Sequence, residues 1–502
     1  MFEQALLTIF NPMSLLTIFG AMVLSMILGI LPGIGPSISI ALTMPFTFFM
    51  EPAVGLGTLV AIYNGAIYGG SISAILINVP GTPGSAATCA DGFAMSQRGD
   101  AGRALGISLS ASVFGGIVSA FALLLIAPVI AKFALLFGPA EYFWLATWGL
   151  TVIAAVTGGK HFITGIIASL IGFLFALVGV DSITGGSRYT FHNLNLFDGI
   201  EMLALVIGTF AAAQVLIMAN EGGSISKAGK ITGKIRDGIF VPFKWGSNLV
   251  TCLKSTGIGI LFGAIPAVGM SAASFFSYAE AMRSSKTPEK FGSGMDEGII
   301  APEASNNATV GGGLIPALTL GIPGTESTAI LLGAIFAYGL RPGASIFVDH
   351  ADVFYAIVVS LILSCTIMLF LGYLGAPLWA KITIVPGTML VPIITVICFI
   401  GAYATGSSKF NILVVVVTGI LAFVMKRFGY SLISFLLGFV LAPLVEDNFV
   451  RAMMISGGSY TGAFFSSWLS NILALLVFFS LFWAIKREFF KKKKPAKPSI
   501  QV

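Results

Sequence analysis

The chain has 502 residues, of which 56% are hydrophobic and 10% are charged, and its formal net charge is +6. Soluble domains usually have about 25% charged residues, so this composition excludes an ordinary soluble domain and fits a protein that lies in lipid. The basic residues gather in short loops and in the C-terminal tail, which is how membrane proteins are oriented, so the positive charge is not interpreted as a nucleic-acid-binding signal.

Long apolar runs recur along the whole chain and favour membrane-spanning helices, which satisfy their own backbone polar groups. The runs lie at 14–30, 36–50, 55–79, 104–137, 141–158, 160–180, 199–219, 257–282, 298–322, 326–340, 353–378, 383–404, 409–425, 430–445 and 463–485. Several are too short for a full crossing and lie beside Pro-Gly motifs, which indicates re-entrant hairpins. We therefore predict an all-α polytopic membrane protein with about 10–12 transmembrane helices plus re-entrant hairpins.

The basic residues predict how the chain is oriented in a cell inner membrane. Lysine and arginine are concentrated in a loop at 221–256 and in a tail at 486–502, and both segments are predicted to be cytoplasmic. Counting crossings back from the loop places the N-terminus in the periplasm. The loop holds Lys227, Lys230, Lys234, Arg236, Lys244 and Lys254, and the tail holds Lys486, Arg487 and Lys491–Lys494.

Two stretches of the chain repeat each other. Residues 64–98 align with residues 307–341 without a gap, and 12 of the 35 aligned positions are identical. Upstream, a motif at 29–37 (the first break) matches a motif at 263–271 (the second break). We predict two membrane repeats, at 1–220 and 257–485, which the distribution of charge orients in opposite directions, a common plan for secondary transporters.

The repeated Pro-Gly-Thr motifs are the strongest candidates for a substrate site. Each interrupts an apolar run, because proline stops the preceding helix and glycine allows the turn. The following helix then presents unpaired amide N–H groups and its positive dipole end to an anion such as a carboxylate. Simple helix capping at a kink is the alternative. The predicted substrate-binding residues are Pro80, Gly81, Thr82, Gly84 and Ser85 of the first loop (Pro80–Ser85), and Gly324, Thr325, Ser327 and Thr328 of the second loop (Pro323–Thr328).

The breaks and the buried amides suggest a cation site. Carbonyl groups freed by a helix break can coordinate Na⁺, although a structural bend would give the same sequence pattern. Asparagine in an apolar run can bind a ligand, coordinate Na⁺ or join helices. The predicted cation-binding residues are Gly33, Gly35, Ser37, Asn64, Asn306 and Asn307.

Few other residues suggest chemistry. Glu303 and Glu326 are candidate intramembrane carboxylates that could bind a cation or carry a proton, or could lie near the surface. The stretch Asp349–Asp352 resembles a metal-ligand cluster only loosely, and no nucleotide-binding GxxxxGK[ST] motif occurs. We therefore expect no enzyme activity, no metal centre and no cofactor beyond a coupling cation, Na⁺.

Three blocks of the sequence resemble the large membrane subunit of the tripartite tricarboxylate transporter family (the TctA-like subunit). They are GILPGIGPSISIALTMPF, YNGAIYGGSISAILINVPGTPGSAATCADGFAMSQRGDAGRALG and GIPGTESTAILLGAIFAYGLRPG. The resemblance implies a small membrane subunit and a periplasmic solute-binding protein as partners. It also implies uptake of tricarboxylates such as citrate, or of related organic acids, driven by an ion gradient. The positions that carry it include Gly33, Gly35, Asn64, Pro80-Gly81-Thr82 and Pro323-Gly324-Thr325.

These observations predict a subunit of a secondary transporter that works by alternating access, with a small carboxylate as substrate. A stand-alone ion-coupled organic anion carrier and a channel, neither using a binding protein, are the alternatives. A channel is disfavoured because the apolar runs contain few charges to line a continuous polar path.

Overall fold

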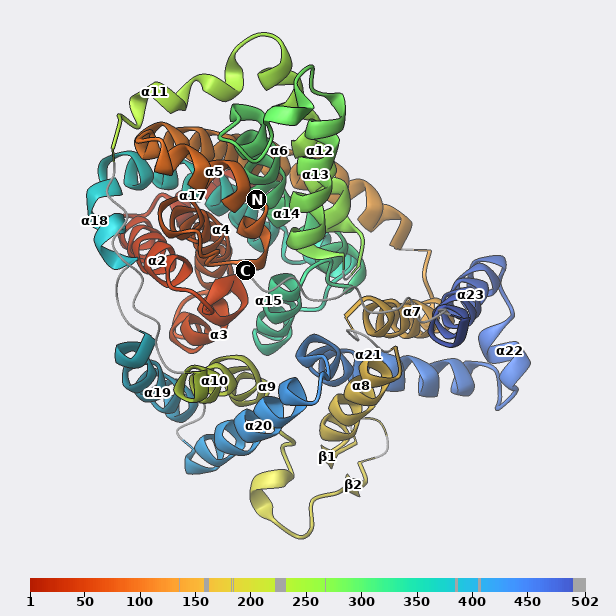
Figure 1. Cartoon of the computed structure of the whole chain (residues 1–502). Helices are drawn as coiled ribbons and strands as arrows, with labels where there is room; N and C mark the ends of the chain where they lie inside the picture. The colour runs from red at the N-terminus through yellow and green to blue at the C-terminus, as the bar shows by residue number, and fades with distance from the viewer. Residues whose placement is uncertain are drawn as a thin grey trace. The chain divides into compact units, whose positions relative to one another are not determined.

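The computed structural model describes residues 1–134, 136–157, 162–181, 183, 185–221, 232–266, 268–383, 387–404 and 408–490 (Figure 1). Most of these residues are helical, and the described strands are β1 (Gly179–Val180) and β2 (Ser187–Arg188), which pair antiparallel. Parts of the basic loop and tail lie outside the described residues, among them Lys227, Lys230 and Lys491–Lys494.

Eight helices in the described part of the chain are long and apolar enough to cross a membrane. They are α2 (Pro12–Ile30), α4 (Pro52–Ile77), α6 (Ala101–Ala134), the continuous α9–η3–α10 (Met202–Asn220), α17 (Ala351–Leu374), α20 (Lys409–Arg427), α21 (Leu432–Ile455) and α23 (Trp468–Phe490). Shorter apolar helices are α8 (Phe162–Ala176), α15 (Glu326–Ala337) and α19 (Gly387–Ala404). The predicted all-α polytopic membrane fold is confirmed, and the total number of crossings stays a prediction.

The other helices connect or flank these spans. They are α1 (Phe2–Ile9), α3 (Gly35–Thr47), α5 (Cys89–Gln97), α7 (Pro139–Thr157), α11 (Arg236–Ile239), α12 (Ser247–Ala264), α13 (Gly269–Ser284), α14 (Asp296–Leu320), α16 (Ala344–Val348), α18 (Ala376–Ile382) and α22 (Tyr460–Phe464). Short 3₁₀ turns are η1 (Pro83–Ala86), η2 (Leu194–Leu196), η4 (Val241–Phe243) and η5 (Pro288–Lys290), and η3 (Ile207–Ala212) is a π-helical segment.

Contacts divide the chain into two compact units. Unit 1 contains residues 1–137 and 175–428, and unit 2 contains residues 138–174 and 429–502. Each unit draws segments from both predicted repeats, so the units do not follow the repeat boundaries near 220 and 257. All the candidate site residues lie in unit 1.

The centre of unit 1 is built twice from corresponding helices. Helix α4 packs mainly on α2 of its own repeat and on α17 of the other repeat. Helix α14, the counterpart of α4, packs mainly on α12 of its own repeat and on α6 of the other. Both α4 and α14 are buried along almost their whole length, which places the repeated motifs at their ends in the interior of the unit.

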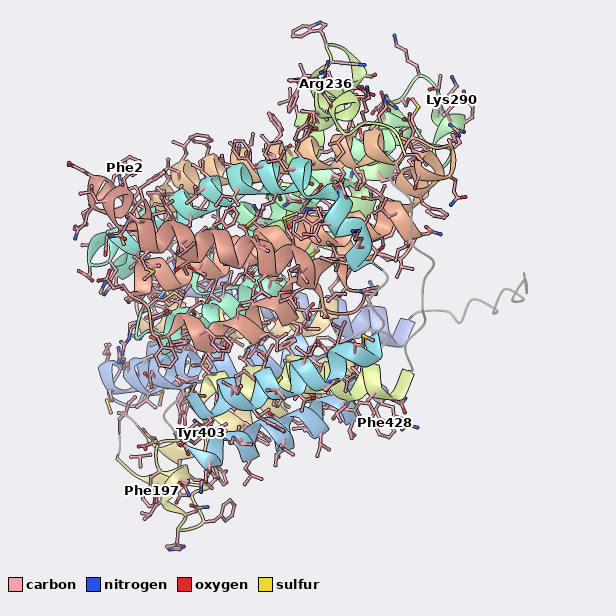
Figure 2. All side chains as sticks on the ribbon, turned by 90° about the vertical axis from the view of Figure 1, so that its left-hand side faces the viewer. Phe2, Phe197, Arg236, Lys290, Tyr403 and Phe428 are labelled. Atoms are coloured by element: carbon pink, nitrogen blue, oxygen red, sulfur yellow. The ribbon has the colours of Figure 1, made fainter. Side chains whose placement is uncertain are left out.

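The two repeats run in opposite directions within unit 1. The connection between α13 and α14 contains Lys290, and its counterpart in the first repeat is the connection between α3 and α4. Phe48 of that connection lines the same pocket as Ala404, next to Tyr403. Figure 2 places Lys290 and Tyr403 toward opposite ends of the long helices. Equivalent connections therefore lie on opposite sides of the unit, as inverted repeats require.

Candidate functional site

The first loop is a helix break whose hydroxyl groups cap the next turn. Helix α4 ends at Ile77, and its C-cap residue Asn78 has a left-handed backbone (φ 57°). Thr82 is the N-cap of η1 and forms a capping box with Ser85, in which each side chain accepts a hydrogen bond from the other residue's backbone N–H. Both residues are buried. The chain thus interrupts its helix at the predicted Pro-Gly-Thr motif. The hydroxyl groups of Thr82 and Ser85 are already used for capping.

The second loop repeats this geometry. Helix α14 ends at Leu320, its C-cap residue Gly321 also has a left-handed backbone (φ 70°), and Thr325 is the N-cap of α15. Thr325 and Thr328 form the equivalent capping box, with N···O distances of 2.8 and 3.1 Å. In both loops the capping hydroxyls hold the turn, so the first-turn amide groups that lack helical partners are what remains to attract an anion.

Each loop rests on the break motif of its own repeat. A Cβ atom added at Gly81 would lie 2.1 Å from the carbonyl oxygen of Gly29, and one added at Gly324 would lie 1.8 Å from the carbonyl oxygen of Gly263. Only glycine allows the two backbones to approach this closely. The two predicted motifs of each repeat therefore form one packed structure.

Each loop is also close to elements of the opposite repeat. The Ser37 and Ser327 hydroxyl oxygens are 3.2 Å apart, which joins the first break to the second loop. The Tyr63 hydroxyl of α4 lies 3.0 Å from Thr325 Oγ1. In the corresponding contact of the first loop, α13 of the second repeat packs against η1. Both predicted sites thus lie where the repeats meet.

The aligned residues Asn64 and Asn307 bind each other. Asn307 Nδ2 donates to Asn64 Oδ1 at 2.9 Å, and Asn64 Nδ2 donates to Ser364 Oγ at 2.9 Å. This is helix-joining geometry, one of the alternatives that the sequence allowed. Asn307 Oδ1 nevertheless has no hydrogen-bond partner among the described residues.

Asn306 has a different environment. Its side chain is fully buried, and neither Oδ1 nor Nδ2 has a hydrogen-bond partner among the residues that the structure describes. The side chain lies against the first loop, since a Cβ atom added at Gly84 would be 2.2 Å from Asn306 Oδ1. A buried amide without partners is costly, so this position fits a site that binds a ligand.

The predicted cation-binding residues fall in two places. Contacts place Ser37, which follows Gly33 and Gly35, beside the second loop. They place Asn306 beside the first loop, where Pro83 is exposed at the surface of the unit. Tyr63 directly precedes the aligned range and therefore corresponds to Asn306, and its hydroxyl already binds the second loop. Sequence reasoning did not select Tyr63, although its alignment with Asn306 could have done so.

Two buried carboxylates lie near the first loop. Glu303, on α14 one turn before Asn306, accepts hydrogen bonds from Thr88, Ser108 and Ser112. Asp91 accepts from three backbone N–H groups of residues 292–295 and from Tyr278. The second predicted carboxylate, Glu326, is the first residue of α15 and is partly exposed. Among the described residues, no three His, Cys, Asp or Glu side chains form a group that could hold a metal ion.

The part of the chain that contains all the candidate site residues matches one protein family. The model of the tripartite tricarboxylate transporter TctA family matches residues 15–437. The chain belongs to this family. This TctA-family chain is also 36% identical over 459 residues to a protein of Agrobacterium vitis described as an uncharacterized 52.8 kDa protein in the TAR-I ttuC' 3' region, an alignment that covers 91% of this chain and 89% of the relative.

A second relative supports the same assignment over a shorter range. An Agrobacterium vitis protein described as an uncharacterized protein in the TAR-II ttuC' 3' region is 37% identical over 203 residues, which cover 40% of this TctA-family chain and 84% of the relative. No solved structure matches the chain. Membership of the TctA family makes the chain a transporter subunit with several apolar helices in a membrane.

Proposed function

We propose that this chain is the large transmembrane subunit of an importer for tricarboxylates or related organic acids, driven by an ion gradient through alternating access. Its partners would be a small membrane subunit and a periplasmic solute-binding protein. Family membership supports this role, and the packing of both repeated loops inside unit 1 supports a site between inverted repeats.

The substrate carboxylates would bind the first-turn amide groups that follow Thr82 and Thr325. The observation that carries this proposal is the pair of equivalent capping boxes, each buried and each packed on the glycine of a break. The capping residues hold the turns in place, and the unpaired amides with the helix dipole supply the attraction for an anion. Such a site needs no buried arginine.

The coupling cation, Na⁺, would bind beside the first loop. The side-chain oxygen atoms of Asn306 and Asn307 are buried and have no hydrogen-bond donor in the described part of the chain. Hard cations prefer oxygen ligands, and broken helices in transporters supply further carbonyl groups. Asn64 would act by orienting Asn307, since it accepts the hydrogen bond from Asn307 Nδ2. The first break, with Gly33, Gly35 and Ser37, is the alternative location, and its Ser37 contacts the second loop.

The orientation that we propose places the N-terminus in the periplasm and the C-terminus in the cytoplasm of a cell with an inner membrane. In Figure 2, Lys290 and Phe428 lie toward one end of the helices of unit 1, and Phe2 and Tyr403 lie toward the other. Phe428 directly follows Lys426 and Arg427, so basic residues mark the first of these ends. Basic residues are enriched on the cytoplasmic side.

Uptake of labelled citrate into proteoliposomes tests the proposal. The chain would be reconstituted with the small membrane subunit and supplied with binding protein and a Na⁺ gradient. We expect Thr82→Val and Thr325→Val each to lower the initial uptake rate at least about fivefold, because loss of an N-cap hydroxyl costs about 1 kcal/mol. Thr82→Ser keeps the hydroxyl and should restore uptake.

The matched control is Thr366→Val, which changes an exposed threonine of α17. It should transport like the wild type, and all variants should reach the membrane in equal amounts. Unchanged uptake kinetics in both loop variants would remove the anion-site proposal. Uptake by this chain alone, without the binding protein, would favour the stand-alone carrier.

A further inference from the structure

Glu303 occupies a site made of hydroxyl groups. It is fully buried on α14. Thr88, at the start of α5, donates to Oε1, and Ser108 and Ser112 of α6 donate to Oε2 at 2.8 and 3.0 Å. No lysine, arginine or histidine of the described residues is among its partners. A carboxylate buried in a membrane protein without a cationic partner is expensive unless it can be neutralised.

A comparison with Asp91 shows why the type of partner matters. Asp91 is also fully buried, but Gly292, Gly294 and Met295 donate backbone N–H groups to it. Backbone N–H groups can only donate, so they stabilise the ionised carboxylate. A hydroxyl group both donates and accepts, so the partners of Glu303 fit either protonation state.

The fold does not require a carboxylate at this position. Extending the gap-free alignment four residues back along the corresponding helices α4 and α14 pairs Glu303 with Val60. Val60 is buried to the same degree and lies on the corresponding helix. An apolar side chain therefore fills the corresponding buried position of α4. This indicates that the carboxylate of Glu303 has a functional role rather than a structural one.

We propose that Glu303 binds a coupling proton, at a site separate from the Na⁺ site beside Asn306. The carboxylate takes a proton from a hydronium ion, which leaves a water molecule, and the new O–H donates to Thr88 Oγ1. Hydroxyl-to-carboxylate distances of 2.8 and 3.0 Å leave no space for a metal ion between these atoms. A proton adds no volume and removes the buried charge.

The titratable side chains that face Glu303 do not compete for this role. Tyr68 on α4 and Cys89 on α5 interact with it electrostatically, and both groups are ordinarily neutral at pH 7. On two other elements packed against α14, Arg103 of α6 pairs with Asp296 at 2.6 Å, and Tyr278 of α13 donates to Asp91.

The proton site is connected to the first loop through Thr88. This residue lies two positions after η1 and is the N-cap of α5, so its hydrogen bond to Glu303 fixes the segment that follows the first loop to α14. Ionised Glu303 requires donation from Thr88, whereas protonated Glu303 can instead donate to it or release it. Gain or loss of the proton thus changes how firmly the loop is held, which is the coupling that a carrier needs. This inference rests on the proposed transport function.

Glu303→Gln tests the inference, because glutamine is a neutral side chain of the same shape. Citrate accumulation would be measured in the same proteoliposomes with a pH gradient, acidic outside, and with equal Na⁺ concentrations on both sides, so that the proton gradient is the only driving force. We expect the wild type to accumulate citrate and Glu303→Gln to fall to background while keeping citrate–citrate exchange. The matched control is Glu297→Gln, another buried carboxylate of α14, whose Oε2 accepts from Ser285. It should keep both activities.

Infrared spectroscopy provides a readout that does not depend on transport. In the difference spectrum between acidic and neutral pH, the wild type and Glu297→Gln should share one carboxyl C=O band that Glu303→Gln lacks, while bands from other carboxyl groups should stay the same in all three. An unchanged spectrum in Glu303→Gln, or accumulation equal to the wild type, would overturn the inference. If the wild type neither accumulates nor exchanges citrate, the proposed function fails, and the infrared comparison still decides whether Glu303 takes up a proton.

Discussion

One added methyl group at Gly324 tests whether the second loop rests on the second break. A Cβ atom there would lie 1.8 Å from the carbonyl oxygen of Gly263, 3.0 Å from its carbonyl carbon and 3.1 Å from the Cα of Gly313. All three are backbone atoms, so no side-chain rotation relieves the overlap, and the loop or a helix must move. Overpacking of a well-packed core typically costs about 1–3 kcal/mol. We expect Gly324→Ala to lower the free energy of unfolding by this amount.

The measurement is an SDS titration of the purified protein, with helix content followed by circular dichroism. Gly81→Ala should behave like Gly324→Ala, because its Cβ would meet the backbone of the first break in the same way. Gly257→Ala is the control, since a Cβ there meets nothing within 4 Å and alanine favours a helix by up to about 1 kcal/mol. If both loop variants proved as stable as Gly257→Ala, the close packing of loops and breaks would be refuted.

Three further substitutions test single interactions of the site. Asn306→Ala should raise the Na⁺ concentration that gives half-maximal citrate uptake about tenfold, equivalent to about 1.4 kcal/mol of binding free energy. Tyr63→Phe should change this concentration less than about twofold. Equal effects of the two substitutions would contradict a Na⁺ site beside Asn306. Asp91→Asn should destabilise the protein by at least about 1.5–3 kcal/mol in thermal unfolding, because buried backbone donors lose a charged acceptor. Asn64→Ala should cost about 0.6–1.7 kcal/mol in the same assay, the range for hydrogen bonds between membrane helices, and no loss would show that its bond to Asn307 contributes nothing.

Local features of the site could be predicted because they depend on short stretches of sequence. Pro80-Gly81-Thr82 and Pro323-Gly324-Thr325 each combine a helix-stopping residue, a turn residue and an N-cap residue. In the structure, one helix ends and the next begins at each of these two loops. The all-α membrane fold follows from the length of the apolar runs. The repeat could be recognised because its two copies keep the same residues at the positions that need glycine for close packing.

Contacts between distant segments could not be predicted in the same way. The sequence allows Asn64 and Asn307 to coordinate a cation, bind a ligand or join helices, and alignment alone does not show that they bind each other. The partners of Glu303 come from residues about 190 to 215 positions away in the chain, so no local pattern predicts them. The serines at 108 and 112 are one helical turn apart in an apolar run, a signal that becomes meaningful only when a carboxylate is found opposite them.

The positions where the repeats agree and the positions where they differ have different roles. Where the two repeats have the same residue, as at Gly81 and Gly324, that residue packs the loop against the break of its own repeat, which both repeats need. Differences on the facing helices coincide with unusual polar groups: Asn306 in place of Tyr63, and Glu303 in place of Val60. Two fully symmetric halves would present the same ligand-binding groups twice. Because, among the described residues, the second repeat supplies both the unpartnered amide and the buried carboxylate beside the first loop, we expect the Na⁺ site and the proton site to lie at the first loop only, although the scaffold around them is built twice.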